Sequence, residues 1–252
     1  KRELEDARRR RRALVGTPAA LGDAHKGGTL ELSGRIALVT GGGTGLGRAI
    51  SLRLARRGCH VAINYSQSSA EADETLQMVR DFGCRALAVK ADVSRRPEVE
   101  EMVRTVEGSL GPVDLLVNSA GTTRYIPFPE VEAIQDVDWE RILGVNLVGQ
   151  FMCTQCVVPG MRERGAGKIL NVASDSAFSS DGSSIPYVVS KAGVVSLTKC
   201  LARALSPAVQ VNALAPGWMA TRWMAKYLPP EMQQKVLSPT PGQLPPADVD
   251  DI

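Results

Sequence analysis

A tyrosine and a lysine stand four residues apart in the stretch YVVSK, residues 187–191. On a helix, positions i and i+4 lie on the same face, so the Lys191 ammonium can approach the Tyr187 hydroxyl. A nearby cation favours the phenolate and lowers a phenol pKa that starts near about 10. The pair could therefore serve as an acid/base group near neutral pH. An amphipathic helix with an exposed lysine has the same spacing, so other motifs must decide between these two interpretations.

A glycine-rich stretch, TGGGTGLG, occupies residues 40–47 between an apolar run and a helical pattern. Glycines at such a turn let the backbone approach an anion, while free N–H groups and the helix dipole face it. Gly41, Gly45 and Gly47 are spaced G-x-x-x-G-x-G, which is not the G-x-G-x-x-G fingerprint. The stretch predicts a site for a nucleotide pyrophosphate, although the same kind of fold also uses glycine in turns that bind nothing.

Polar tips follow four further apolar runs: NYS (64–66), ADV (91–93), NSAG (118–121) and NVAS (171–174). In open α/β sheets, ligands collect at the carboxyl ends of the strands. An acid at the end of the second strand would bind the adenosine ribose and repel a 2′-phosphate. Asn64, Tyr65 and Ser66 supply no acid there, and no arginine clamp is evident. We therefore expect NADP(H) to be favoured over NAD(H), with a merely solvated loop as the alternative.

Short β-branched runs alternate with amphipathic stretches from about residue 32 onward. The predicted strands cover 35–40, 60–64, 85–89, 113–118, 168–173 and 209–215, and the predicted helices cover 46–57, 68–82, 96–109, 131–162 and 186–205. Near-continuous apolar runs are typical of strands buried on both faces, and the alternation indicates βαβ units. The pattern predicts a single α/β domain over 32–252, a doubly wound, Rossmann-like parallel sheet. Residues 218–245 interrupt the rhythm and are predicted to form a substrate lid.

Charge is unevenly spread over the 252 residues, whose net charge is +3. Residues 1–12 carry seven Lys/Arg and three Asp/Glu, which gives +4 and leaves −1 for the remainder. The basic excess thus belongs to an arm over residues 1–31, expected to be disordered, and the domain has no excess suited to nucleic acid. A localisation or polyanion-binding tag is the alternative for this arm.

The cysteines predict neither a disulfide framework nor a metal centre. Five are scattered through the chain, which favours reduced thiols and a cytoplasmic location. Cys153 and Cys156 form one C-x-x-C, but there is no second such pair, and the only histidines are His25 and His60. Two thiols on an apolar helix are the better interpretation. No run of 18 apolar residues occurs, so no membrane span is expected.

These motifs together resemble the short-chain dehydrogenase/reductase family, in particular its 3-oxoacyl-[acyl-carrier-protein] reductase-like branch, from about Leu32 to Ile252. The departures are Ser119, which replaces the second asparagine of N-N-A-G, and Thr44, where NADP(H)-preferring members often carry a basic residue. Asp175 and Ala177 also differ from the commoner pattern after the serine, and Asp175 could either touch substrate or face solvent. The resemblance implies the catalytic set Asn146, Ser174, Tyr187 and Lys191. It also implies the cofactor-binding set Gly41, Thr44, Gly45, Leu46, Gly47, Asn64, Tyr65, Ser66, Asp92, Val93, Asn118, Ala120, Gly121, Tyr187, Lys191, Pro216, Gly217, Met219 and Thr221.

The resemblance also implies the roles of these residues. Tyr187 would protonate the alkoxide formed when a hydride reaches a carbonyl, while Lys191 would lower its pKa and hold the nicotinamide ribose. Ser174 would hydrogen-bond the carbonyl oxygen, and Asn146 would hold a water in a proton path. Thr221 would hold the nicotinamide carboxamide.

The expected function is hydride transfer between NAD(P)(H) and a carbonyl or secondary alcohol, with a 3-oxoacyl thioester, carried by an acyl carrier protein, among the substrates that fit. A sterol or an alicyclic ketone would also fit the apolar lid. The alternative is a catalytically impaired, nucleotide-binding regulatory protein, or a truncated family member. Residues 245–252 resemble the start of the family's penultimate helix, so a final strand is expected to be missing and the sixth strand to form a hydrophobic edge. Apolar residues on 131–162 and 186–205 imply a homodimer or homotetramer.

Overall fold

The structure is a computed structural model that describes residues 32–219, 221–231 and 233. The predicted arm over 1–31 lies outside the described residues. So do the end of the predicted lid and the chain after it, where the expected loss of a final strand would be tested.

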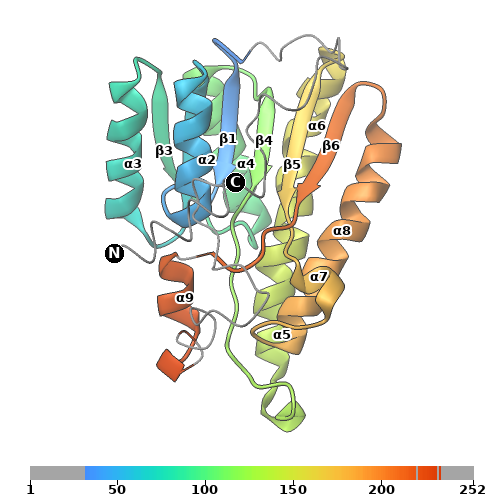
Figure 1. Ribbon diagram of the computed structural model, residues 1–252. Coiled ribbons are helices and arrows are strands. Elements are labelled where there is room, and N and C mark those ends of the chain that lie inside the picture. Colours follow the sequence, from blue (N-terminus) through green and yellow to red (C-terminus); the bar gives the residue numbers. More distant parts are fainter. Residues whose placement is uncertain (1–31, 220, 232, 234–252) are drawn as a thin grey trace, which may run out of the picture.

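Within the described residues, six strands form one parallel sheet in the order β3-β2-β1-β4-β5-β6. The strand order reverses direction between β1 and β4, which is where open α/β folds place their ligands. The predicted doubly wound sheet is therefore confirmed (Figure 1). The strands are β1 (Ile36–Thr40), β2 (His60–Tyr65), β3 (Ala86–Lys90), β4 (Leu115–Asn118), β5 (Gly167–Val172) and β6 (Val209–Leu214).

The helices fall close to their predicted ranges, with short additions at the carboxyl edge of the sheet. The predicted helix over 131–162 is divided into a 3₁₀ turn, an α-helix, a π-helical segment and a second α-helix. The helices are α2 (Gly45–Arg56), α3 (Ser69–Asp81), α4 (Arg96–Leu110), η2 (Val131–Ala133), α5 (Asp136–Leu143), η3 (Gly144–Val148), α6 (Gly149–Glu163), α7 (Ser176–Ser179), α8 (Ile185–Leu205) and α9 (Arg222–Tyr227).

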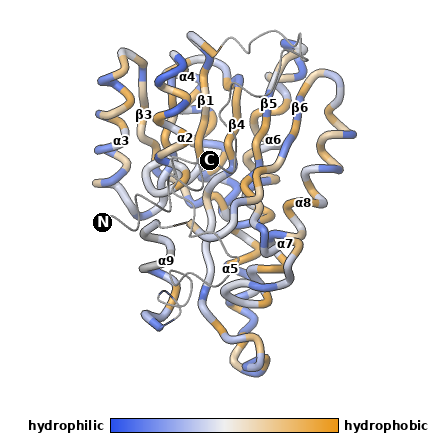
Figure 2. The backbone as a smooth tube through the Cα atoms, viewed as in Figure 1, coloured by the Kyte–Doolittle hydropathy of each residue, from blue (hydrophilic) through white to orange (hydrophobic). Residues whose placement is uncertain are grey.

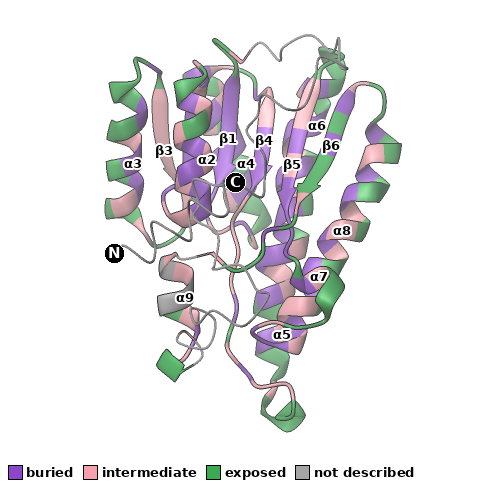
Figure 3. Ribbon diagram, in the orientation of Figure 1, coloured by how far each residue is buried: buried purple, intermediate pink, exposed green. Residues whose placement is uncertain are grey.

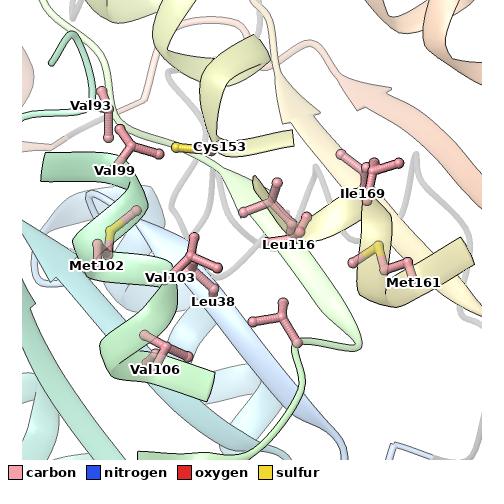
Figure 4. Close-up of a cluster of buried hydrophobic side chains, with 14 of the residues drawn as sticks. Leu38, Val93, Val99, Met102, Val103, Val106, Leu116, Cys153, Met161 and Ile169 are labelled. Atoms are coloured by element: carbon pink, nitrogen blue, oxygen red, sulfur yellow. The ribbon is translucent and has the colours of Figure 1, made fainter. Parts of the chain in front are cut away.

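The core consists of two apolar layers, one on each face of the sheet. Helices α2 and α3 pack over β1 and β2, whereas α4, α6 and α8 pack on the opposite face. In the second layer, Leu38, Leu116 and Met161 are fully buried (Figure 4). The residues of the strands are accordingly the most apolar, and the helices have one apolar and one polar side (Figure 2). This packing holds the strand ends, and hence the motifs that follow them, in fixed positions.

The edge strand β6 departs from its prediction as a strand buried on both faces. Val209 and Val211 are buried, whereas Gln210 and Asn212 are exposed (Figure 3). The strand alternates because, among the described residues, helices cover only one of its faces. The prediction that this strand is buried on both faces is therefore wrong, while the predicted edge depends on residues outside those described.

Two helical stretches, Asp136–Glu163 and Ile185–Leu205, are long and apolar enough to cross a membrane by length and composition alone. Core helices of soluble proteins pass the same test, and both stretches pack against other elements of the domain: α6 contacts β4 and β5, and α8 contacts β5 and β6. Cys153 lies inside the core on α6, where burial raises its pKa to about 12, and Cys156 on the same helix is half-buried.

Candidate active site

A cavity of about 450 Å³ opens at the carboxyl edge of the sheet. The loops after all six strands line it, together with the start of α8 and residues of α9, which lies beyond the strand ends in Figure 1. The cavity collects every residue of the predicted catalytic and cofactor-binding sets except Asn118 and Asn146. Segments separated by more than a hundred residues in sequence thus meet in one space.

The glycine-rich turn presents backbone to this cavity. Gly45 has a φ of +50°, and a Cβ built there would meet, among the described residues, only Thr221, at 3.8 Å. Thr44 caps α2 without a side-chain hydrogen bond, and the first turn of α2 carries no acidic residue. The first amides of a helix have no partner within it, so this end can receive an anion. The turn therefore fits the phosphate groups of a nucleotide.

Gly47 serves the turn in a different way, by allowing backbone to pack on backbone. A Cβ at Gly47 would overlap the carbonyl oxygen of Gly41. Gly41 itself has a φ of +63°, a left-handed conformation that glycine adopts without strain. The two glycines fix the path of the turn, while Gly45 leaves space in front of it.

Asn64 supports this turn from beneath. Its Oδ1 accepts a hydrogen bond from the Gly41 N–H at 3.3 Å, and its Nδ2 donates to the Ala91 carbonyl oxygen at 3.0 Å. The side chain, predicted to belong to the cofactor-binding tip, is thus buried and engaged by the protein. Tyr65 and Ser66 of the same tip line the cavity together with Asn64.

Asp92 is held by partners that the sequence did not reveal. The Ser94 hydroxyl donates to its Oδ1 at 2.6 Å, and Arg141 of α5 donates to its Oδ2 at 2.7 Å. Burial acts to raise the pKa of Asp92, but the hydrogen bonds from Ser94 and Arg141 outweigh it, so the pKa lies below its usual value. Arg141 also lines the cavity. Because 49 residues separate Arg141 from Asp92, no local sequence pattern predicted that the two side chains would pair.

The loop after β4 is tied to the end of β1 through Thr40. Its Oγ1 accepts hydrogen bonds from the N–H groups of Ser119 and Ala120 at 3.0 and 3.1 Å. Because these are backbone donors, serine at position 119 leaves them intact. Asn118 lies below the cavity and donates to the Asn171 Oδ1 at 2.9 Å, which joins the ends of β4 and β5.

Asn146 also lies outside the cavity wall, in the π-helical segment η3. Its Oδ1 accepts from the Thr122 N–H at 2.8 Å, and its Nδ2 donates to the Thr122 carbonyl oxygen and to the Ser190 Oγ, both at 3.0 Å. The side chain braces the loop after β4 against α8, and π-helical segments often mark functional positions. A water held by Asn146 remains a prediction. The neighbouring Thr122, which lines the cavity, was missed although it directly follows NSAG.

Tyr187 and Lys191 face the cavity from the first turns of α8. Lys191 is 4% exposed, its Nζ donates to the Val172 carbonyl oxygen at 2.9 Å, and the Nζ lies 5.7 Å from the centroid of the Tyr187 ring. Burial lowers the pKa of Lys191 to about 8. The predicted proximity of the two side chains is therefore present.

The predicted direction of the Tyr187 pKa is wrong for the chain as it stands. Burial, with a smaller contribution from the nearby Asp175 carboxylate, raises that pKa to about 12, although the Ser174 hydrogen bond acts to lower it. Desolvation of the phenolate is the largest of these effects, and Lys191 is not among the groups that shift this pKa. Tyr187 is consequently a protonated acid over the whole neutral range.

Aromatic residues of α9 cover this pair. The Trp223 ring lies 6.2 Å from that of Tyr187 and 4.5 Å from that of Tyr227, measured between centroids. The Tyr227 hydroxyl is 3.4 Å from the Thr122 Oγ1. The described part of the predicted lid thus lies beside Tyr187 and lines the same cavity.

Comparisons with known proteins agree with this geometry. A family model described as short chain dehydrogenase matches residues 35–231. A candidate ketoacyl reductase of the granaticin polyketide synthase of Streptomyces violaceoruber is 39% identical over 188 residues, which covers 75% of this chain and 74% of the relative. A 3-oxoacyl-[acyl-carrier-protein] reductase of Synechocystis sp. is 37% identical over 191 residues, with 75% and 76% covered. The solved structure of a candidate short-chain alcohol dehydrogenase from Sinorhizobium meliloti 1021 superposes with a TM-score of 0.80 at 32% identity, covering 88% of this chain and 87% of that one.

Gly47→Ala should destabilise the protein because its methyl group would collide with the backbone of Gly41. Overpacking of this kind costs about 1–3 kcal/mol of unfolding free energy, measurable by urea denaturation. Gly108→Ala is the matched control, since Gly108 is also helical and a Cβ there meets no atom of the described residues within 4 Å. The control should be neutral, or stabilising by up to about 1 kcal/mol. Equal stabilities of the two variants would contradict this view of the turn.

Lys191→Met should stabilise the cofactor-free protein at pH 7, because it removes a buried ammonium. The Val172 carbonyl would keep its hydrogen bond from Gln150. With a pKa of about 8 in the folded chain and about 10.4 when unfolded, the unfolded state binds more protons between these values. The lysine penalty, on the order of 3 kcal/mol, is therefore complete below pH 8 and vanishes above about pH 10.4.

The measurement is the difference in unfolding free energy between Lys191→Met and the unmodified chain, from pH 7 to pH 10. This gain should shrink as the pH rises. Lys199→Met, at an exposed position on the same helix, should show a small difference that does not change with pH. A gain at Lys191 that stays constant would mean that the lysine does not carry a depressed pKa.

Proposed function

The chain belongs to the short-chain dehydrogenase family, and from this premise we propose that it is an NADP(H)-dependent oxidoreductase that interconverts a carbonyl group and a secondary alcohol. The observation that carries the proposal is the meeting of Ser174, Tyr187 and Lys191 in one cavity with the glycine-rich turn. Family membership makes the chain an oxidoreductase and implies a nicotinamide cofactor. The choice of NADP(H), the residue roles and the substrate are the parts that we add.

The chemistry proposed for the cavity assigns proton donation to the protein. A bound reduced nicotinamide would supply the hydride for the carbonyl carbon. Negative charge then develops on the carbonyl oxygen, and Tyr187 donates its proton to that oxygen. Its pKa of about 12 supports this role, because the phenol stays protonated at neutral pH yet remains more acidic than an alcohol. The Ser174 hydroxyl donates a hydrogen bond to the same oxygen.

Several residues would hold the cofactor. The amides at the start of α2, beside Gly45, would receive the pyrophosphate. Lys191 would donate to the nicotinamide ribose, which would give its buried ammonium a further partner. Thr221, next to Gly45, would position the carboxamide.

The substrate class is proposed from the relatives and from the lid. Two relatives carry ketoacyl or 3-oxoacyl reductase in their names, so a 3-oxoacyl thioester, on an acyl carrier protein or free of it, is a suitable candidate. The apolar rings of Trp218 and Trp223 along the cavity also suit other ketones. Unpaired thiols among the described residues support a cytoplasmic location. A purely regulatory nucleotide-binding protein is not favoured, since it would not need a buried lysine beside a tyrosine.

Tyr187→Phe should abolish carbonyl reduction and leave the affinity for NADPH nearly unchanged, because the ring still packs but has no proton to give. Turnover is followed at the nicotinamide absorbance with a panel of ketones and 3-oxoacyl thioesters, and NADPH affinity by calorimetry. Tyr125→Phe is the matched control, since Tyr125 does not line the cavity. Comparable turnover in Tyr187→Phe would eliminate Tyr187 as the acid.

Cofactor choice should follow the tip of β2, where Tyr65 and Ser66 line the cavity without a carboxylate. We expect NADPH to bind more tightly than NADH. Tyr65→Asp should reverse the order, because a carboxylate repels the 2′-phosphate and binds ribose hydroxyls. The measurement is the dissociation constant of NADPH and of NADH for each variant, by calorimetry, with Tyr65→Asn as the uncharged control. A tenfold preference of the unmodified chain for NADH, about 1.4 kcal/mol, would overturn this assignment.

We also propose a homodimer or homotetramer formed through η3, α6 and α8. Val148, Phe151 and Val189 on these elements are 42%, 37% and 44% exposed, an apolar surface that a partner copy would cover. Phe151→Glu should therefore shift the mass measured by light scattering toward the monomer. Phe82→Glu, at an exposed phenylalanine next to α3, should leave the mass unchanged. A monomeric unmodified chain at micromolar concentration would contradict the proposal.

A further inference from the structure

Asp175 stands beside the catalytic serine, and the fold makes little use of its carboxylate. It precedes the short helix α7, but its side chain makes no capping hydrogen bond there. Among the residues whose side chains the structure describes, none forms an ion pair with it. Its main chain is fixed, since the Asp175 N–H donates to the Pro216 carbonyl oxygen at 3.0 Å. The carboxylate is exposed and lines the cavity.

The contacts of the two carboxylate oxygens show where it points. Oδ1 accepts a hydrogen bond from the Ser174 hydroxyl at 3.0 Å. Oδ2 lies 3.1 Å from the position that a Cβ on Gly217 would occupy, so the glycine leaves room for it. An ionised carboxylate has about four acceptor sites, and these contacts leave several open to the cavity. Because the Ser174 hydroxyl has a single hydrogen, it must turn from Oδ1 to donate to a ligand carbonyl, which would then lie close to a carboxylate with further free acceptor sites.

A fixed negative charge at this place opposes a negative charge on the reacting oxygen. It also disfavours the Tyr187 phenolate, in keeping with its effect on that pKa. A hydrogen-bond donor on the substrate, next to the carbonyl, would engage the carboxylate and offset this repulsion. A substrate carboxylate at the same position would be repelled.

We propose that Asp175 determines specificity: it selects substrates that carry a hydroxyl or ammonium group on the carbon next to the carbonyl, and it rejects substrates with an acid there. The inference rests on the proposed carbonyl reduction and names a substrate class other than the 3-oxoacyl thioester, which carries no hydrogen-bond donor on that carbon. The shared chemistry is a hydrogen-bond donor facing a carboxylate. The two possible donors, hydroxyl and ammonium, differ in charge, so separate substrates can distinguish them.

The test uses one ketone scaffold, CH₃–CO–CH₂–X, at pH 6 with the full chain. The group X is methyl in 2-butanone, hydroxyl in hydroxyacetone, ammonium in aminoacetone and carboxylate in acetoacetate. We measure kcat/KM for reduction with NADPH, and binding by saturation-transfer NMR in the presence of NADP⁺. The unmodified chain should favour the donors over methyl by about tenfold or more, and should disfavour acetoacetate.

Three variants assign this preference to the charge and the acceptor. Asp175→Asn keeps an acceptor oxygen, so the ammonium preference and the rejection of acetoacetate should disappear while part of the hydroxyl preference stays. Asp175→Ala should lose both preferences. Asp181→Asn is the matched control, because Asp181 is an exposed carboxylate of the same loop that does not line the cavity; it should behave as the unmodified chain does.

The outcomes separate this inference from the proposed function. Reduction of the panel without a donor preference, or a preference unchanged in Asp175→Ala, overturns the role of Asp175 and leaves carbonyl reduction standing. Donor-selective binding that depends on Asp175, without any turnover, supports the role of Asp175 and counts against the proposed reaction. Neither selective binding nor turnover would overturn both.

Discussion

The site depends on a lysine buried at the carboxyl edge of a parallel sheet. Removing an ammonium from water is costly, and Lys191 receives only the Val172 carbonyl oxygen as a hydrogen-bond partner among the described residues. Its pKa falls to about 8 as a result. A buried ammonium lowers the free energy of unfolding, and an apolar side chain at this position would make the fold more stable. A ligand with hydroxyl groups in the cavity would give this ammonium further hydrogen-bond partners.

The sheet supplies the geometry that this lysine needs. Reversal of the strand order between β1 and β4 opens the space for a ligand, and Thr40 and Asn118 tie the adjoining loops together. The π-helical segment η3 turns Asn146 toward the loop after β4 and toward α8. Backbone and amide contacts of this kind fix the cavity before any ligand binds, so the side chains that line it require little reorganisation.

Local pattern was sufficient to predict the parallel sheet, most helices to within two residues, and the gathering of the motifs at one edge. It could not predict features that depend on which distant residue arrives as a neighbour. Asn64 turns inward because Gly41 and Ala91 offer it partners, and Arg141 reaches Asp92 across 49 residues. The Tyr187 pKa was predicted in the wrong direction because the i, i+4 spacing shows the nearby cation but not the depth of burial. Likewise, the exposure of β6 depends on which helices cover it.

The central claim is that this cavity delivers a hydride to a carbonyl carbon while Tyr187 supplies the proton. The most direct measurement incubates the full chain with a reducible ketone and NADPH that carries deuterium at both C4 positions of the nicotinamide, followed by mass spectrometry of the alcohol. The account predicts one carbon-bound deuterium in each alcohol molecule formed, at the former carbonyl carbon, and no such product from Tyr187→Phe. Alcohol formed without carbon-bound deuterium, or labelled alcohol at an unchanged rate from Tyr187→Phe, would contradict it.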